Sequence, residues 1–539
     1  MINSNLRRIL FATASVAVLS GCGANDIASP GTGGNVTINN TPAPAPAPTP
    51  TPTPTSTLVT AATGCPTIAD PAGLTDAGTI TGPTGSYRQC NLPARITRSS
   101  TLARIPGVLY ALPGRVDVGT DQGATTTGTT NVVLTIEPGA IIFGNTGVSW
   151  LAVNRGNSIQ AVGTAARPII FTSRDNVLGL NTDTSSGQWG GVVLMGRAQI
   201  TDCAASGAAP GTAACERQTE GAIDPAVYGG TNNTESSGRM SFVQIRYSGF
   251  VLSANSELQS LTTEGTGSGT RLDHIQSFNS SDDGAEFFGG RVNMTHFISV
   301  GAEDDNLDTD TGLKGNFQYV LVAQRAGSES RGTDSIIEAD SDNAVDGDNP
   351  RQNTIVSNFT FIHRVNNTSA LSAIFLRGGT DYTLVNGVVV APSPSPSCLR
   401  ISRAQTASAT ANPAIDELGA PVFRSVVMQC GATPFLGANG VTNADVTSIF
   451  GAGSNNNSAT FTPSFTSTFI NGPAETAVTA FNATPLTASA ANGPFFELTN
   501  YIGAVRDAND TWYRTWTCNS ATLDLGTGNT GLCTSLPTA

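Results

Sequence analysis

The 539-residue chain has little charge, few aromatic side chains and almost no lysine. Charged residues make up 12% of the sequence and aromatic residues 6%, and Lys314 is the single lysine. The 27 basic residues are outnumbered by 40 acidic ones, which gives a formal net charge of -13. This balance argues against nucleic acid and against an anionic membrane surface as partners.

Side chains that hold zinc or haem are also scarce. The chain has three thinly spread histidines, and no two of its nine cysteines are spaced as CxxC. Structural zinc sites need four nitrogen or sulfur ligands in recognisable clusters. We therefore expect neither a zinc nor a haem site.

The N-terminal segment is typical of an exported protein. Arg7 and Arg8 precede a short apolar run that ends at Leu19, which is a signal peptide pattern and too short for a permanent membrane span. The four residues LSGC that end at Cys22 resemble a bacterial lipobox. The resemblance implies that residues 1–22 are a lipoprotein signal peptide and that Cys22 carries lipid (palmitate). Gly23, in place of aspartate, implies the outer membrane, at its periplasmic or cell-surface face.

A proline-rich stretch separates this segment from the rest of the chain. Residues 41–56 read TPAPAPAPTPTPTPTS. Alternating proline favours polyproline II, a semi-rigid spacer of roughly 50 Å at ~3.1 Å per residue. We interpret residues 23–57 as a disordered Pro/Thr-rich linker and residues 58–539 as the body of the protein.

Eight cysteines remain after Cys22, and an even number in an exported chain favours disulfides. Eight cysteines allow 105 connectivities, of which pairing between neighbours is the simplest. The eight are Cys65, Cys90, Cys203, Cys215, Cys398, Cys430, Cys518 and Cys533.

The body contains short β-rich runs separated by Gly, Asn and Asp, whereas helical periodicity is rare. One acidic segment, FNSSDDGAEFFGG at 278–290, is followed 22 residues later by VGAEDDNLDTDTG at 300–312. Such a fixed period is typical of solenoids, and 22 residues suit a coil of three short strands and three turns. His274 and His296 should then be vertical neighbours in a polar ladder, with Gln318 next.

Two earlier segments, LTIEPGAIIFGN and SIQAVGTAARPIIFTSRDN, resemble rungs of right-handed parallel β-helices. The predicted fold is therefore an all-β, right-handed parallel β-helix solenoid with loop insertions. We expect the aromatic tail NDTWYRTWTC, with Trp512, Tyr513 and Trp516, to be a C-terminal cap on the last coil, because solenoids need their terminal core covered.

Several segments together resemble a family of secreted bacterial right-handed parallel β-helix lipoproteins. They include VLYALPGRVDVG, WGGVVLMGRA, SDDGAEFFGGRVNMTHFISVGAEDDNLDTDTG, IIEADSDN and YIGAVRDANDTWYRTWTC, in an order that covers nearly the whole body. The resemblance implies the fold and implies no particular reaction.

A looser resemblance is to β-helix enzymes that act on polysaccharides. The adjacent Asp282 and Asp283 resemble the aspartate pair of polygalacturonases, but neither Gly-His-Gly nor Arg-x-Lys follows. Calcium-dependent pectate lyases use stacked carboxylates for the metal and an Arg or Lys as the base. The basic residues available for that role are Arg291, Lys314, Arg325 and Arg331, although no lyase motif places them.

Residues 282–348 hold 15 of the 40 acidic residues. Carboxylates stacked one coil apart, about 4.8 Å, repel one another unless protons or a cation intervene. Numerous oxygen ligands favour calcium, although the segment after Glu338 lacks the glycine and final glutamate of an EF-hand loop. The predicted calcium ligands are Asp282, Asp283, Glu286, Asp304, Asp305 and Asp308.

The insertion 325–353 is longer than a coil, and long loops on repeat scaffolds often carry function. Its alternating carboxylates could complete the same site. The predicted ligand-binding residues are Glu286, Glu338, Asp340 and Asp342, and the candidates for catalysis are Asp282, Asp283 and Asp305.

Three functions remain open on the sequence alone. The first is an outer-membrane lipoprotein that binds an extracellular ligand, such as polysaccharide, beside a TonB-dependent receptor. The second is a calcium-assisted polysaccharide lyase or hydrolase. The third is a non-catalytic adhesion or structural surface protein, which needs no binding site; the acidic turns are then solvated or hold a calcium ion that merely fastens the coils.

Overall fold

The computed structural model describes residues 58–125, 131–253, 256–326, 335–341, 347, 349–364, 372–391 and 397–538. The predicted signal peptide, the predicted lipidation site Cys22 and the predicted linker lie outside these residues. The chain from Ser56 to Ala539 forms one compact unit. Among the described residues, none of the helices has the length and apolar character needed to cross a bilayer.

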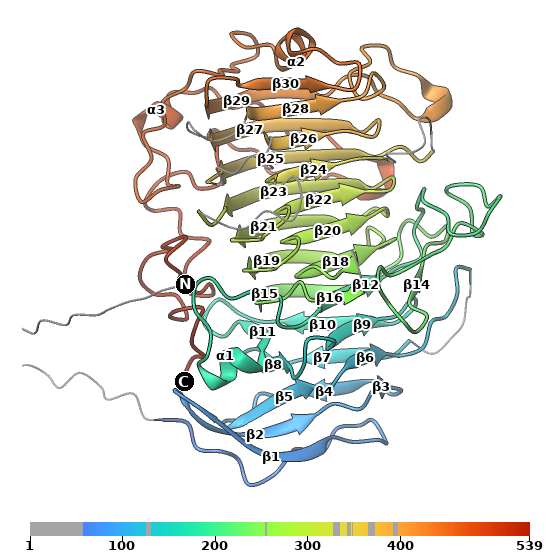
Figure 1. Ribbon diagram of the computed structural model, residues 1–539, viewed down its shortest axis with the longest axis vertical. Coiled ribbons are helices and arrows are strands. Elements are labelled where there is room, and N and C mark those ends of the chain that lie inside the picture. The colour runs from blue at the N-terminus through green and yellow to red at the C-terminus, as the bar shows by residue number, and fades with distance from the viewer. Residues whose placement is uncertain are drawn as a thin grey trace, which may run out of the picture. The chain divides into compact units, whose positions relative to one another are not determined.

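Two long sheets build this unit, and their strands run parallel except for the antiparallel pair β1 and β2 (Figure 1). The larger sheet contains β1 (Thr75–Gly82), β2 (Gly85–Asn91), β4 (Ser100–Leu102), β5 (Val108–Leu112), β7 (Val133–Ile136), β8 (Ile141–Gly144), β10 (Ser158–Val162), β11 (Ile169–Ser173), β15 (Gly238–Arg246), β19 (Arg271–Phe278), β21 (Asn293–Val300), β23 (Lys314–Ala323), β25 (Asn353–Ile362), β27 (Asp381–Ala391) and β29 (Val422–Cys430).

The smaller sheet contains β3 (Arg95–Ile96), β6 (Arg115–Val118), β9 (Trp150–Val153), β12 (Gly191–Met195), β18 (Leu261–Glu264), β20 (Ala285–Phe288), β22 (Leu307–Asp310), β24 (Ile337–Ala339), β26 (Ser372–Leu376), β28 (Ser397–Ser402) and β30 (Phe435–Ala438). Each strand pairs with the strand one coil earlier and one coil later, which is the pairing of a parallel β-helix. The all-β solenoid predicted from the repeats is confirmed.

Each coil has three faces because the strands of the larger sheet bend. In the early coils the first face is made by β4, β7 and β10, and the second face by β5, β8 and β11. From β15 onward one long strand spans both faces, since its first part pairs with β10 and its second part with β11. The smaller sheet is the third face.

The bend falls at a residue with positive φ, a conformation that ordinary side chains adopt rarely. The seven residues at this corner are Phe242, His274, His296, Tyr319, Asn358, Asn386 and Ser425. Asparagine tolerates this conformation, whereas aromatic residues need further stabilisation to hold it. Stacking along the corner provides that stabilisation.

The corner side chains of four successive coils form a ring stack. Centroid distances are 4.3 Å from Phe242 to His274, 4.3 Å from His274 to His296, and 4.6 Å from His296 to Tyr319. The predicted neighbours His274 and His296 do stack, but the next residue is Tyr319, so the prediction of Gln318 is wrong. The turn after β22 is one residue longer than the turn after β20, which shifts the register by one.

The interior of the coils is a continuous apolar core. Side chains that follow the corner point inward and stack from coil to coil, among them Ile275, Phe297, Val320 and Phe359. Gly387 takes the next place in this row, because a Cβ there would lie 1.9 Å from the Phe359 ring. The ring thus fills the space of two layers.

Helix α2 (Asn443–Phe450) covers the last coil, where Phe450 packs 5.4 Å from Phe423 and 5.1 Å from Phe435. The predicted cap made by Trp512, Tyr513 and Trp516 is therefore wrong. These residues lie beside the middle coils, and Trp516 is fully buried against Phe242 and His274.

The aromatic tail is part of a C-terminal strap, residues 481–536, that runs back along the bent corner toward the first coils. Asn386 of β27 holds the backbone of Phe481 through two hydrogen bonds, Gln318 of β23 holds Glu497, and Gln276 of β19 holds Cys518. Arg246 of β15 then binds the carbonyl of Cys533. Polar side chains of these four coils thus fasten the strap.

The remaining elements are short. They are β13 (Arg217–Gln218), β14 (Val227–Tyr228), β16 (Val251–Ser253), β17 (Ser256–Glu257), α1 (Arg174–Leu178), α3 (Pro473–Thr476) and two 3₁₀ turns at Pro413–Ile415 and Ala490–Asn492. Four disulfides join cysteines that are neighbours in sequence, as the simplest pairing predicted: Cys65–Cys90, Cys203–Cys215, Cys398–Cys430 and Cys518–Cys533.

Candidate metal centre

Carboxylates line the outer side of the third face. Side chains alternate along a strand, so every second residue points away from the core and stacks on its equivalent one coil away. One outward row contains Glu286 of β20, Asp308 of β22 and Glu338 of β24, each in register with the next. It continues with Phe375 of β26 and Arg400 of β28.

A second group of carboxylates comes from the turns that enter this face. Asp283 and Asp305 occupy equivalent places, and the Asp305 amide donates to Asp283 Oδ1 at 2.8 Å. Asp282 and Asp304 stand one residue earlier in the two turns, and the amide of Gln259 donates to Asp282 Oδ2 at 3.1 Å. The repeat of 22 residues therefore brings the two acidic turns together.

Three overlapping sets of carboxylates result. In each set the oxygens lie within 4.8 Å of one another. The sets are Asp282, Asp283 and Asp304; Asp283, Glu286 and Asp308; and Asp305, Asp308 and Glu338. The last two sets are buried, whereas Asp282 and Asp304 of the first are half-buried. Every predicted calcium ligand thus lies in at least one set.

The crowding shifts the acidity of these groups. Burial, followed by the charges of neighbouring carboxylates, raises the pKa of Asp283, Glu286, Asp305 and Asp308 well above the ordinary range. Oδ1 of Asp308 is buried and has no hydrogen-bond partner within the described part of the chain. A proton or a cation is needed there.

Two arginines stand at one end of the acidic row. Nε of Arg377 lies 2.5 Å from Glu338 Oε1 and 3.3 Å from Asp340 Oδ2. Burial alone would lower the pKa of Arg377, but the charges of Glu338, Asp340 and Asp310 outweigh burial and raise it. Arg377 is therefore a fixed countercharge and cannot act as a base.

The other arginine, Arg400, stacks on the ring of Phe375, with 4.2 Å between its guanidinium carbon and the ring centroid. Burial lowers the pKa of Arg400, and the charge of Arg377 lowers it further, against the opposing effect of Glu338. Its Nε has no hydrogen-bond partner among the described residues.

The basic residues singled out in the sequence are engaged elsewhere. Arg291 donates to the carbonyls of Gly290 and Gly312, Lys314 pairs with Asp416, and Arg325 pairs with Glu303 at 2.6 Å. Arg331 and the predicted ligand-binding residue Asp342 lie outside the described residues. The predicted ligand-binding residues Glu338 and Asp340 both form ion pairs with Arg377.

Sequence reasoning missed Asp310, Arg377 and Arg400. Aligning LDTD (307–310), IEAD (337–340) and IFLR (374–377) as strands would have placed Asp310, Asp340 and Arg377 in one row. That alignment was hidden because Asp308 and Glu338 are 30 residues apart and Glu338 and Phe375 are 37 apart, in place of 22.

The donor set suits a hard divalent cation. All members are oxygen ligands, and three at a time stand within reach of one ion, which is the chemistry that calcium prefers. One buried oxygen, Oδ1 of Asp308, also has no partner in the described part of the chain. Glu286, Asp308 and Asp283 are the residues that would hold a buried ion. Asp282 and Asp304 would hold one at the half-exposed edge.

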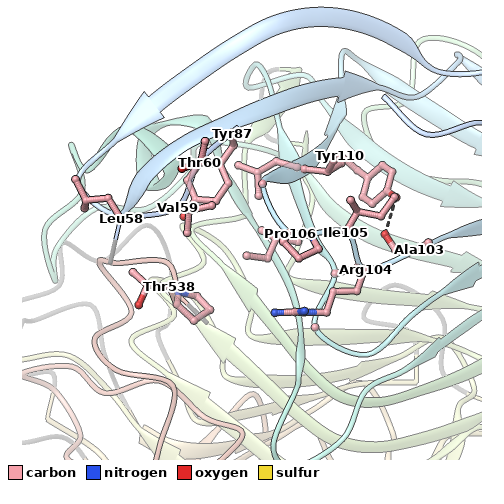
Figure 2. A pocket seen from close by; sticks show the side chains of 17 residues that line it. Leu58, Val59, Thr60, Tyr87, Ala103, Arg104, Ile105, Pro106, Tyr110 and Thr538 are labelled. Atoms are coloured by element: carbon pink, nitrogen blue, oxygen red, sulfur yellow. Dashed lines mark hydrogen bonds between the residues drawn. The ribbon is translucent and has the colours of Figure 1, made fainter. Parts of the chain in front are cut away.

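A separate cavity of about 320 Å³ lies near the first coils (Figure 2). Its walls come from β2, which contributes Tyr87, from β5 and β8, and from Ile105 and Pro106 before β5. Residues at the two ends of the described body, Leu58, Val59 and Thr538, complete them. Tyr110 donates from its hydroxyl to the Ala103 carbonyl at 2.6 Å. No carboxylate side chain lines the described wall, so the cavity does not resemble the acidic centre.

The coils and the acidic row define a right-handed parallel β-helix with a carboxylate-lined face. The family described as a pectate-lyase-like β-helix domain matches residues 121–466, nearly two thirds of the chain. The protein therefore belongs to the pectate-lyase-like β-helix family. No curated protein and no solved structure matches the chain. The family takes its description from a polysaccharide-cleaving enzyme, which supports a polysaccharide-related function.

Proposed function

We propose that the protein is an outer-membrane lipoprotein whose β-helix binds an extracellular polysaccharide through calcium ions held on its third face. The observation that carries the proposal is the overlap of three carboxylate sets around Asp283 and Asp308, with one buried oxygen of Asp308 that has no hydrogen-bond partner among the described residues. Calcium accepts six to eight oxygen ligands. A bound ion would offset the repulsion between the carboxylates and would coordinate this oxygen of Asp308.

The burial of the sets supports two roles. Asp308 shares one buried set with Glu286 of the preceding coil and another with Glu338 of the following coil, so a cation in either set fastens two neighbouring coils. Asp282 and Asp304 are half-buried, so a cation beside them keeps room for oxygen atoms of a sugar. Binding is thus assigned to carboxylates of the turns and stabilisation to carboxylates of the strand row.

The proposed location in the outer membrane rests on the N-terminal sequence. The lipobox-like segment would attach lipid to Cys22, and the proline-rich residues 41–56 would hold the β-helix away from the membrane. A lipoprotein of this kind suits a position beside a TonB-dependent receptor, to which it could present a captured polysaccharide.

A second candidate is a calcium-assisted polysaccharide lyase. The observation that favours it is Arg400, a basic residue of the acidic face with a lowered pKa and a free Nε within the described chain. A lyase would use Arg400 to take the proton from the carbon beside a sugar carboxylate. The predicted catalytic candidates Asp282, Asp283 and Asp305 lie three or four coils from Arg400, so a cation held by them would bind a different sugar unit of the same polymer. Binding remains the primary proposal because Arg377, the arginine nearest the carboxylates, keeps its proton.

The test uses the compact unit that begins at Ser56, with the variants D308N and D304N and the control D224N. Asp224 is exposed, and its side chain has no partner among the described residues. Calcium at 100 times its Kd should stabilise the folded chain by about 2.7 kcal/mol. Thermal unfolding with calcium and with chelator measures this gain.

We expect D308N to lose most of the calcium-induced rise in Tm. D304N should keep much of that rise but lose retention on a polysaccharide column, and D224N should behave as the native chain. If neither calcium nor chelator changes the Tm of the native chain, the proposal is refuted. If D308N loses the Tm rise but the native chain retains no polysaccharide, calcium only stabilises the fold and the binding role is refuted.

A further inference from the structure

A groove of about 480 Å³ crosses three coils on the first face, away from the sheet that carries the carboxylates. One wall is formed by β15, β19 and β21, and the other by residues 492–495 of the strap. The lining residues are Arg239, Ser268, Thr270, Arg271, Leu272, Asp273, Asn293, Thr295, Asn492, Pro494 and Phe495. Its volume is within the range of ligand sites.

Two arginines stand side by side in this groove. Arg239 of β15 and Arg271 of β19 are partners in register, so their backbones lie about 4.8 Å apart and their side chains leave the same face. Two adjacent guanidinium groups are unusual in a chain with a net charge of -13. They make this part of the surface attractive to anions.

The acid between them is already engaged. Asp273 accepts from Arg239 at 3.2 Å, from His274 Nδ1 at 3.0 Å and from the Ser241 hydroxyl. Arg271 is exposed and has no hydrogen-bond or ion-pair partner among the described residues. The fork of Arg271 donors is therefore available for a carboxylate, sulfate or phosphate group.

The opposite wall adds an aromatic ring, and Asn293 of β21 adds a fixed amide. Phe495 is half-buried and rests at 5.1 Å against the buried ring of Phe496. Asn293 is held because its Oδ1 accepts from Asn492 at 2.6 Å and from the Asn316 amide at 3.1 Å. A ring, an amide and a free guanidinium in one groove suit an anionic sugar unit.

We propose that this groove is a second, calcium-independent binding site for an acidic glycan. Arg271 pairs with the anionic group, Arg239 supports it, and Phe495 packs against the sugar ring. The inference shares its ligand class with the proposed function but uses another sheet and no cation. The strap completes the site, because Phe495 and Asn492 belong to it.

The test measures binding by the Ser56–Ala539 unit in EDTA, with polygalacturonate as the carboxylate probe, dextran sulfate as the sulfate probe and dextran as the neutral control. The variants are R271A and F495A, with R98A as the matched control because Arg98 is exposed and its side chain has no partner within the described chain. D304N reports on the acidic face.

We expect the native chain, R98A and D304N to bind at least one acidic polymer equally well in EDTA, and none of them to bind dextran. R271A should weaken Kd at least tenfold, and F495A should weaken it less. Binding should fall as salt rises. Absence of binding to both acidic polymers in EDTA, or equal Kd values for R271A and R98A, would overturn the inference. Neither outcome bears on calcium binding by Asp308, so this failure is distinguishable from failure of the proposed function.

Discussion

At the scale of single residues, stacking decides the state of each carboxylate. Asp308 is an ordinary aspartate by sequence, but one coil on either side of it stand Glu286 and Glu338. Its pKa is raised because it is buried and then because Asp283 and Glu338 are charged. A residue of this kind is stable only when a proton or a metal ion is shared with its neighbours.

This arrangement predicts an unusual pH dependence. In chelator, the free energy of unfolding should fall as the pH rises from about 4.5 to about 8. Burial raises the pKa of Glu235 to about 7 and that of Glu264 to about 8, and the acidic row is shifted in the same direction. The folded chain then binds more protons than the unfolded chain, so each step up in pH costs stability.

Urea unfolding at pH 5 and pH 8 in EDTA measures the slope. Saturating calcium should flatten it, because the ion replaces the protons on Asp308 and its neighbours. D308N should have a smaller slope than D224N. A stability that increases with pH in EDTA would contradict the assigned pKa directions.

At the scale of elements, the strap depends on side-chain amides of the long strands. Gln276 is fully buried, and its amide donates to the Cys518 carbonyl at 3.0 Å while its Oε1 accepts from the Cys518 amide at 2.9 Å. Q276A would leave both backbone groups buried without partners. We expect a loss of about 2–4 kcal/mol in the free energy of unfolding.

Urea titration gives the loss, and hydrogen exchange at residues 513–525 shows whether the strap opens locally. The control is Q218A, because Gln218 is exposed and holds only the Ala222 carbonyl. Equal midpoints for Q276A and Q218A would show that the strap is held by its aromatic residues alone.

The regular elements could be predicted from the sequence, whereas the strap and the cap could not. When successive coils have the same length, the repeat in the sequence predicts which residues are stacked, as it did for His274 and His296. The step from His296 to Tyr319 contains one extra turn residue, which no repeat reveals. Trp516 packs on the corner of distant coils through a return path that leaves no periodic pattern.

The candidate site divides in the same way. Asp282, Asp283, Asp304 and Asp305 were predicted together because their turns repeat after 22 residues. Arg377 was missed because insertions lengthen the two coils before it. The position of Arg377 as the counterion of the acidic row therefore follows only from the pairing of the strands in the structure.

At the scale of the whole molecule, binding and cleavage can be separated by products. The Ser56–Ala539 unit, incubated with acidic and neutral polysaccharides in calcium, should retain polymer without creating new chain ends. An assay for new chain ends checks this expectation. Ends that disappear with chelator and in R400A would instead establish the lyase alternative, with R98A as the matched control.

The path of the strap also bears on the order in which the chain can complete its fold. Residues 481–536 contact β27 first and β15 and β19 later, so the segment that follows the last coil is needed by coils that emerge much earlier. The corner of those early coils stays unsealed until the end of the chain arrives. A chain cut before residue 481 would lack this segment, and the side-chain amides of Gln276, Gln318 and Asn386 would lose the backbone groups that they bind.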